Sequence, residues 1–188
     1  KIMPSIKNLE QMTLSLGGDK PKKVAVAAGH DPNTIQAAAH ASKTGIAKMI
    51  LVGNGKQIES LCSEKGIDRN LFKIIDEPDA ITAEAKARDM VHNKDADVLM
   101  KGLIGTADYM RLILDKEKGL LPKGNILTHI TVFDLPAYNK LLFASDVAII
   151  PLPNIDIKKK LLRYCIDAAH SFGIDKPKAA LLAASEKI

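Results

Sequence analysis

The sequence predicts a doubly wound α/β fold, in which helices cover both faces of a parallel sheet. Short runs of small and β-branched residues alternate with longer helix-like stretches, and turns containing Gly, Asn, Asp or Pro separate them. Strands that are joined through helices of about ten or more residues run parallel. The composition agrees with helices packed on a sheet, because 46% of the 188 residues are hydrophobic and only 4% are aromatic.

The first part of the chain predicts four strands, each followed by a helix. A turn with Gly or with acidic residues follows each strand, and Asp31-Pro32-Asn33 supplies the helix-start chemistry of the first helix. The strands are expected at 24–28, 48–52, 72–75 and 98–100, and the helices at 34–43, 57–65, 81–92 and 107–114. These units form the predicted parallel sheet.

The second part of the chain predicts three more strands and one long helix. The strands are expected at 126–133, 147–150 and 179–183, and the helix at 155–172. Residues 116–125 are polar and interrupted by Gly and Pro, which is typical of a domain boundary. We therefore expect a first α/β domain over 1–122 and the start of a second over 123–188. The second domain is expected to be incomplete, because the sequence stops directly after its last predicted strand.

Composition and charge favour small anionic ligands over macromolecular ones. The formal net charge is +5, from 27 basic and 22 acidic residues, which favours phosphates and coenzyme A. Nucleic acid is not expected, because the lysines are dispersed and no aromatic residues interleave the densest run, 158–160. No segment approaches the roughly 20 apolar residues of a membrane helix, and no apolar signal-peptide core is present. We expect a cytoplasmic protein without a membrane partner.

Metal and nicotinamide sites are not expected. Cys62 and Cys165 lie far apart in helix-like segments, without the close spacing of a zinc site or redox pair, and are predicted to be buried or idle thiols. The turns at 29–31 and 53–55 each lack a glycine of the dinucleotide fingerprint, and no Walker-type loop is present.

The segment 100–111, MKGLIGTADYMR, is the strongest candidate for a binding site. It leaves a hydrophobic strand, crosses two glycines and enters a helix at or near Thr106, and ligands of parallel sheets collect at the carboxyl ends of strands. The free N–H groups and the dipole of a helix start favour an anion there. The predicted phosphate-binding residues are Lys101, Gly105, Thr106, Ala107 and Arg111.

A purely structural interpretation of this segment stays open. Thr106 could cap the helix, Asp108 could complement the helix dipole, and Arg111 could pair with Asp108 on a solvated face. His129 is a second candidate, either catalytic or a polar interior contact. The structural role is favoured, because the spacing supplies His129 with no carboxylate or nucleophile partner. Asp146 is expected to close a turn, and Asn154 to cap a helix.

Three segments resemble, in order and spacing, the phosphate butyryltransferase and phosphate acetyltransferase family. They are 100–111, LTHITVFDLPAYNKLLFASDVAIIPLPNI at 127–155 and DAAHSFGIDKPKAALLAASEKI at 167–188. The resemblance covers most of the chain from Val24 onward, and its second half is the more specific. The Lys101-Gly102 pair and the strand around His129 look more like the butyryl branch than the acetyl branch.

The resemblance implies two α/β domains of the isocitrate and isopropylmalate dehydrogenase type, with a substrate cleft between them. It implies reversible transfer of a short acyl group between coenzyme A and inorganic phosphate, giving an acyl phosphate, with no metal or redox cofactor. In the acetyl enzymes a Thr-Ala-Asp helix start and its following Arg help to hold phosphate, at positions that match 106–108 and Arg111 here. A homo-oligomer, and specifically a dimer, is the expected assembly.

The sequence departs from the family in length. The Arg and Asp to which the acetyl enzymes assign phosphate binding and thiol deprotonation lie near the carboxyl end of that family, so they are expected beyond Ile188. These 188 residues alone are therefore expected to catalyse little or nothing. The alternative hypothesis is a non-catalytic module that binds phosphate or coenzyme A, or a fragment of a larger assembly.

Overall fold

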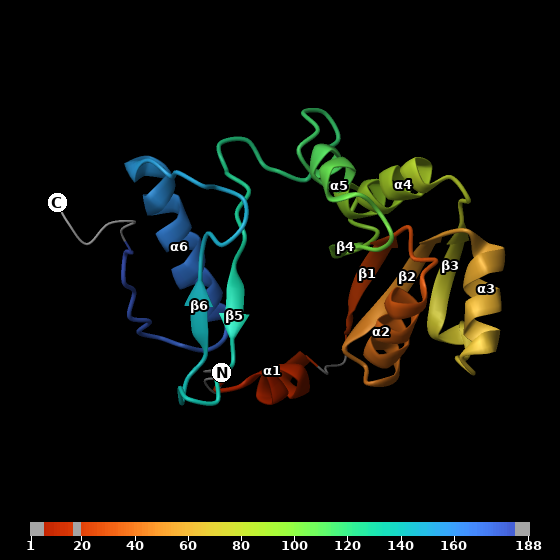
Figure 1. Cartoon of the computed structure of the whole chain (residues 1–188), viewed down its shortest axis with the longest axis horizontal. Coiled ribbons are helices and arrows are strands. Elements are labelled where there is room, and N and C mark those ends of the chain that lie inside the picture. Colours follow the sequence, from red (N-terminus) through yellow and green to blue (C-terminus); the bar gives the residue numbers. More distant parts are fainter. Residues whose placement is uncertain (1–5, 17–19, 183–188) are drawn as a thin grey trace. The chain divides into compact units, whose positions relative to one another are not determined.

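The computed structural model describes residues 6–16 and 20–182, which divide into two compact units (Figure 1). Ser15–Lys123 forms one, here called the sheet unit. Lys1–Leu14 and Gly124–Ile188 form the other, here called the hairpin unit.

A four-stranded parallel sheet forms the centre of the sheet unit, in the order β3-β2-β1-β4. Its strands are β1 Lys22–Ala27, β2 Ala47–Gly53, β3 Phe72–Asp76 and β4 Val98–Lys101. Each coincides with a predicted strand within a few residues. The predicted α/β class with a parallel sheet is confirmed.

Three helices of the sheet unit begin at side-chain caps. α2 Pro32–Lys43 starts where the Asp31 carboxylate accepts hydrogen bonds from the N–H groups of Asn33 and Thr34, at 3.0 and 3.1 Å. Asn54 and Asp79 cap two further helices by the same contact. These two are α3 Gly55–Glu64 and α4 Ala80–His92; the unit also holds the short 3-10 helix Arg69–Leu71 and α5 Thr106–Ile113.

Helices lie on both faces of the sheet, because successive strand residues point to opposite faces. On one face Val26 and Leu51 pack with Ile35 of α2 and Ile58 of α3. On the other face strand residues pack with α4, and the side chains in contact there are small. They are Ala25 and Ala27 of β1 with Ala83 and Ala87 of α4. These alanines let α4 approach the sheet closely.

The hairpin unit contains a two-stranded antiparallel sheet and one long helix. The strands are β5 Thr131–Phe133 and β6 Leu142–Ala144, and the helix is α6 Ile155–Ser171. The rings of Phe143 and Phe172 meet edge to face with centroids 5.1 Å apart, which joins the hairpin to the end of α6. α1 Leu9–Leu16, which the sequence did not predict, begins in this unit: the N–H of Leu9 donates to Asp134.

Of the three strands predicted for the hairpin unit, one is shorter than predicted and two are not formed in the described residues. Within the strand expected at 126–133, only β5 forms. β6 forms in the segment that was expected to connect this strand to the one at 147–150. The pair is antiparallel because no helix separates its strands. Residues 147–149 form a bend, and residue 150 is not in a strand either. Residues 179–182 are exposed and not in a strand; residue 183, the last of that prediction, lies outside the described residues.

The chain changes direction at β1. From β1 it proceeds to β2 and β3 on one side, then crosses back to place β4 on the other side of β1. Where the chain leaves β4, the N–H of Gly102 donates to the carbonyl of Ala27 (2.9 Å), and the N–H of Leu103 donates to that of Ala28 (3.0 Å). The carboxyl ends of β1 and β4 are therefore joined at the topological switch point of the sheet.

Gly102→Ala is expected to destabilise the sheet unit. A Cβ at Gly102 would lie 2.5 Å from the carbonyl oxygens of both Ala27 and Ala28, so the backbone would have to shift. We expect the free energy of unfolding, measured with urea, to fall by about 3 kcal/mol. Gly105→Ala is the matched control, because its Cβ would meet only Asp108 Oδ2, at 3.2 Å, and should cost no more than about 1 kcal/mol. Equal losses from both substitutions would contradict the close approach at Gly102.

Candidate functional site

The candidate site lies where α5 begins, immediately after the switch point. Gly105 is the N-cap residue, with φ −60° and ψ 136°, and among the described residues no side chain makes a cap hydrogen bond to α5. Thr106 is the first helical residue, so the interpretation of Thr106 as a cap is wrong. The first N–H groups of a helix have no acceptor within the helix, and the dipole adds positive potential there. A small anion fits this helix start.

The predicted phosphate-binding residues are all exposed and lie within one short segment, 101–111. Lys101 is the last residue of β4, and Gly105, Thr106 and Ala107 form the start of α5. Arg111 lies in the last turn of the same helix. The structure therefore places all of them between the end of β4 and α5, and their binding of phosphate stays a prediction.

The Asp108 carboxylate is the anion already present at the helix start. Its Oδ2 lies 3.2 Å from where a Cβ of Gly105 would be, and its Oδ1 accepts a hydrogen bond of 2.7 Å from Arg111 Nη1. Both side chains are largely exposed, at 77% for Arg111 and 54% for Asp108. The sequence left two partners open for Arg111, a bound anion or Asp108. In the structure Arg111 pairs with Asp108.

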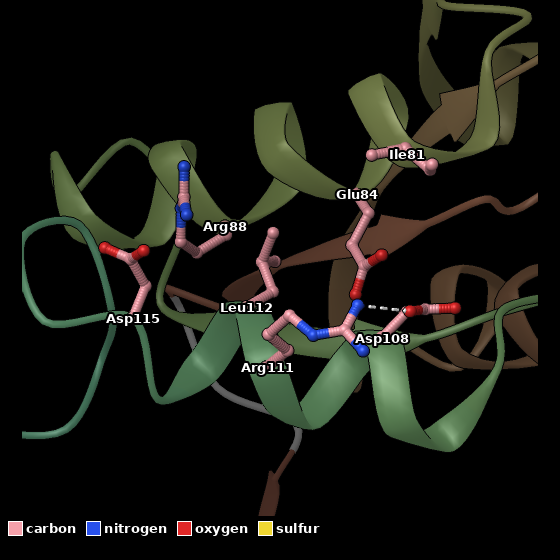
Figure 2. A pocket seen from close by; sticks show the side chains of 7 residues that line it. All are labelled: Ile81, Glu84, Arg88, Asp108, Arg111, Leu112 and Asp115. Carbon is pink, nitrogen blue, oxygen red and sulfur yellow. Dashed lines mark hydrogen bonds and ion pairs between the residues drawn. The ribbon is translucent and has the colours of Figure 1, made fainter.

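Arg111 also lines a pocket between α4 and α5, which Figure 2 shows. The pocket has a volume of about 200 Å³ and is lined by Ile81, Glu84, Arg88, Asp108, Arg111, Leu112 and Asp115. Glu84 and Arg88, which are 2% and 6% exposed, were not predicted from the sequence. Their positions in the sequence were one available signal of burial. Glu84 and Arg88 lie four residues apart and directly follow Ala83 and Ala87, the small residues that contact the sheet.

Glu84 is the unusual group of this pocket. Its Oε1 is buried and has no hydrogen-bond partner among the residues that the structure describes. Burial raises the pKa of the Glu84 carboxyl above its usual range, and the charge of Asp108 raises it further. The two arginines of the pocket oppose this rise. Arg88 is committed elsewhere, because its Nε and Nη2 contact Asp89 Oδ1 at 2.8 and 2.7 Å.

Tyr109 lies on α5 beside this pocket. Burial raises the pKa of its phenol, and the charge of Glu84 adds to that effect. The hydroxyl donates to the carbonyl of Leu99 at 3.2 Å, which ties α5 to β4. Tyr109 therefore serves to orient the helix whose first turn is the candidate site.

His129 and Asp146 lie together in the hairpin unit. Asp146 accepts four hydrogen bonds. They come from the Thr128 hydroxyl (2.7 Å) and from the N–H groups of His129 (3.1 Å), Ala148 (2.7 Å) and Ile149 (2.7 Å). The expectation that Asp146 closes a turn is confirmed, and these bonds explain why residues 147–149 bend. The His129 ring contacts the Thr131 hydroxyl through Nδ1 at 3.3 Å, and a catalytic role of this ring stays a prediction.

Within residues 6–16 and 20–182, no group of three or more His, Cys, Asp or Glu side chains is arranged to hold a metal ion. In the same ranges, no helix has the length and apolar character that crossing a bilayer requires.

Asn154 accepts a hydrogen bond from the N–H of Ile157 at 2.9 Å, so its predicted capping role is confirmed.

Comparisons with known proteins agree on one family. The family model described as phosphate acetyl/butaryl transferase matches residues 7–85 and 79–188. The phosphate butyryltransferases of Clostridium acetobutylicum and Clostridium beijerinckii are 37% and 35% identical to the chain, over 97% and 93% of its length. The chain spans 60% and 57% of those two proteins.

A solved structure supports the fold. The crystal structure of a branched-chain phosphotransacylase from Enterococcus faecalis V583 matches 87% of this chain and 56% of its own, with a TM-score of 0.68 and 24% sequence identity. At that identity the likeness concerns the fold alone. It agrees with the parallel α/β architecture described above.

Asp146→Asn is expected to destabilise the hairpin unit in a pH-dependent way. Although burial raises the pKa of Asp146, its hydrogen bonds outweigh burial and hold the pKa well below the usual range. Because the folded-state pKa is lowered, the Asp146 carboxylate stabilises the fold at pH values above its unfolded-state pKa of about 3.9. This stabilisation is lost as the pH falls below that value toward the folded-state pKa. The variant should therefore be less stable at neutral pH by about 2 kcal/mol, with a smaller difference in acid.

Amide hydrogen exchange of α6 and β6 measures this difference within the unit itself. Asp175→Asn is the control, because Asp175 is exposed and makes no hydrogen bond within the described part of the chain. A difference between wild type and Asp146→Asn that does not change with pH would contradict the role of the carboxylate charge.

Proposed function

The chain belongs to the phosphate acetyl/butaryl transferase family, and on this basis we propose that the whole protein exchanges a short acyl group between coenzyme A and inorganic phosphate. In the butyryl form, butyryl-coenzyme A and phosphate give butyryl phosphate and coenzyme A. The names of the two clostridial relatives favour the butyryl substrate over the acetyl one.

The start of α5 is the observation that supports this proposal most directly. Phosphate would accept hydrogen bonds from the N–H groups of Thr106 and Ala107 and from the Thr106 hydroxyl, in the positive potential of the helix start. Arg111 has five N–H donors, so it can donate to phosphate while one nitrogen stays on Asp108. Lys101 adds a mobile positive charge.

The proposed reaction needs no change of oxidation state. A phosphate oxygen attacks the thioester carbonyl, the carbon–sulfur bond breaks, and the sulfur leaves as thiolate and takes a proton. In the reverse direction the thiol, whose pKa is about 8.5 in free cysteine, must first lose its proton to a base. We therefore propose coenzyme A as substrate and no metal or redox cofactor.

Further expectations belong to this proposal. They are the two-domain architecture of the isocitrate and isopropylmalate dehydrogenase type, a homo-oligomeric state that is most simply a dimer, and a cytoplasmic location. Acyl-coenzyme A, phosphate and acyl phosphate are the proposed partners.

Thioester formation from butyryl phosphate and coenzyme A tests the proposal. The whole protein is expected to form the thioester, and the 188-residue chain is measured beside it for both turnover and coenzyme A binding. If the whole protein forms no thioester while the chain still binds coenzyme A, a non-catalytic binding module explains the protein better.

Arg111→Ala is expected to weaken phosphate use without unfolding the protein. A lost charge-assisted hydrogen bond should raise the KM for phosphate at least about tenfold. Stability should hardly change, because exposed ion pairs contribute little. Arg163→Ala is a matched control: its side chain is also 77% exposed and pairs with Asp167 at 3.2 Å. An unchanged phosphate KM in the Arg111 variant would leave Arg111 as a surface partner of Asp108 only.

A further inference from the structure

Glu84 is a buried acid whose Oε1 has no hydrogen-bond partner among the described residues, and it faces the side chain that we propose to hold phosphate. Its side chain is almost fully buried, and Figure 2 shows it pointing from α4 toward the Arg111 guanidinium on α5. The described contacts include no ion pair between the two residues. A buried carboxylate that lacks a partner is costly, so Glu84 must either stay neutral or acquire a cation.

Arg111 is the cation that can move to Glu84. The charged and titratable groups that face Glu84 are Arg88 on its own helix and Asp108, Tyr109 and Arg111 on α5. Arg88 is held by Asp89 through two contacts, whereas Arg111 makes one exposed pair with Asp108 that costs little to break.

We propose that Glu84 is a positioning residue that sets the direction of Arg111. When Glu84 is neutral, Arg111 stays with Asp108 at the start of α5, where an anion can share it. When Glu84 is ionised, it draws the guanidinium into the pocket and away from the helix start. The role rests on the proposed function, because it takes Arg111 as a phosphate contact.

A linkage between the anion and the proton follows. If ionised Glu84 withdraws Arg111 from the anion, then a bound anion must raise the pKa of Glu84 by the same coupling factor. Anion affinity should therefore fall as pH rises through the pKa of Glu84, which burial and Asp108 already place above the usual range.

The test uses sulfate as the probe, because sulfate keeps its charge over the range where phosphate changes its protonation. Sulfate affinity of the full chain is measured by calorimetry from about pH 5 to about pH 9 at constant ionic strength. Wild type should lose at least about fivefold in affinity, and Glu84→Gln should keep the acid-side affinity throughout. Glu59→Gln, which removes an exposed charge paired with Arg69 on the same unit, should behave as wild type.

A second measurement does not depend on whether Glu84→Gln is stable. The carbon-13 signal of the Glu84 carboxyl is titrated in wild type with and without sulfate, and again in Arg111→Ala. Sulfate should raise the pKa of Glu84 in wild type and leave it unchanged in Arg111→Ala. An equal loss of affinity with pH in wild type and Glu84→Gln, or no effect of sulfate on this pKa, would overturn the positioning role.

The two roles can fail separately. Thioester formation by the whole protein without a sulfate effect on Glu84 would reject the positioning role alone. A sulfate effect on Glu84 without thioester formation would reject acyl transfer alone.

Discussion

The two hydrogen bonds that join the end of β4 to the end of β1 determine where α5 begins. Gly102 and Leu103 donate to consecutive carbonyls of the β1 end, and the approach is so close that a side chain at Gly102 would overlap both. The chain therefore leaves the sheet at a fixed point after Lys101 and begins α5 at Thr106. Every proposed contact with phosphate depends on this backbone contact.

The small residues on the other face of the sheet create the environment of Glu84. Ala83 and Ala87 let α4 pack closely on β1, so the neighbouring Glu84 and Arg88 are buried beneath α5. Tyr109 holds α5 in place through the carbonyl of Leu99. The same packing places Glu84, whose Oε1 has no hydrogen-bond partner among the described residues, beside Arg111. In the role that we propose for Glu84, this couples the charge of α4 to the start of α5.

The sequence predicted those parts of the fold that local chemistry controls. Asp31 and the glycines around β4 signal helix starts and turns within a few residues, and the four strands of the parallel sheet follow from their composition. The hairpin unit was predicted poorly, because β6 depends on pairing with β5 and the bend at 147–149 depends on the contacts of Asp146. Glu84 was missed for the same reason: its burial comes from a helix more than twenty residues later.

The two interpretations of Arg111 that the sequence left open are compatible. Asp108 occupies only one nitrogen of the guanidinium, and its carboxylate lies beside Gly105 at the helix start that an anion would share. An exposed pair of this kind keeps Arg111 near the site at little cost, whereas a buried pair with Glu84 would remove it. A neutral Glu84 therefore leaves the Arg111 guanidinium available to an anion. An ionised Glu84 would compete with the anion for it. Burial of Glu84, which raises its pKa, is therefore compatible with the phosphate site that we propose at the start of α5.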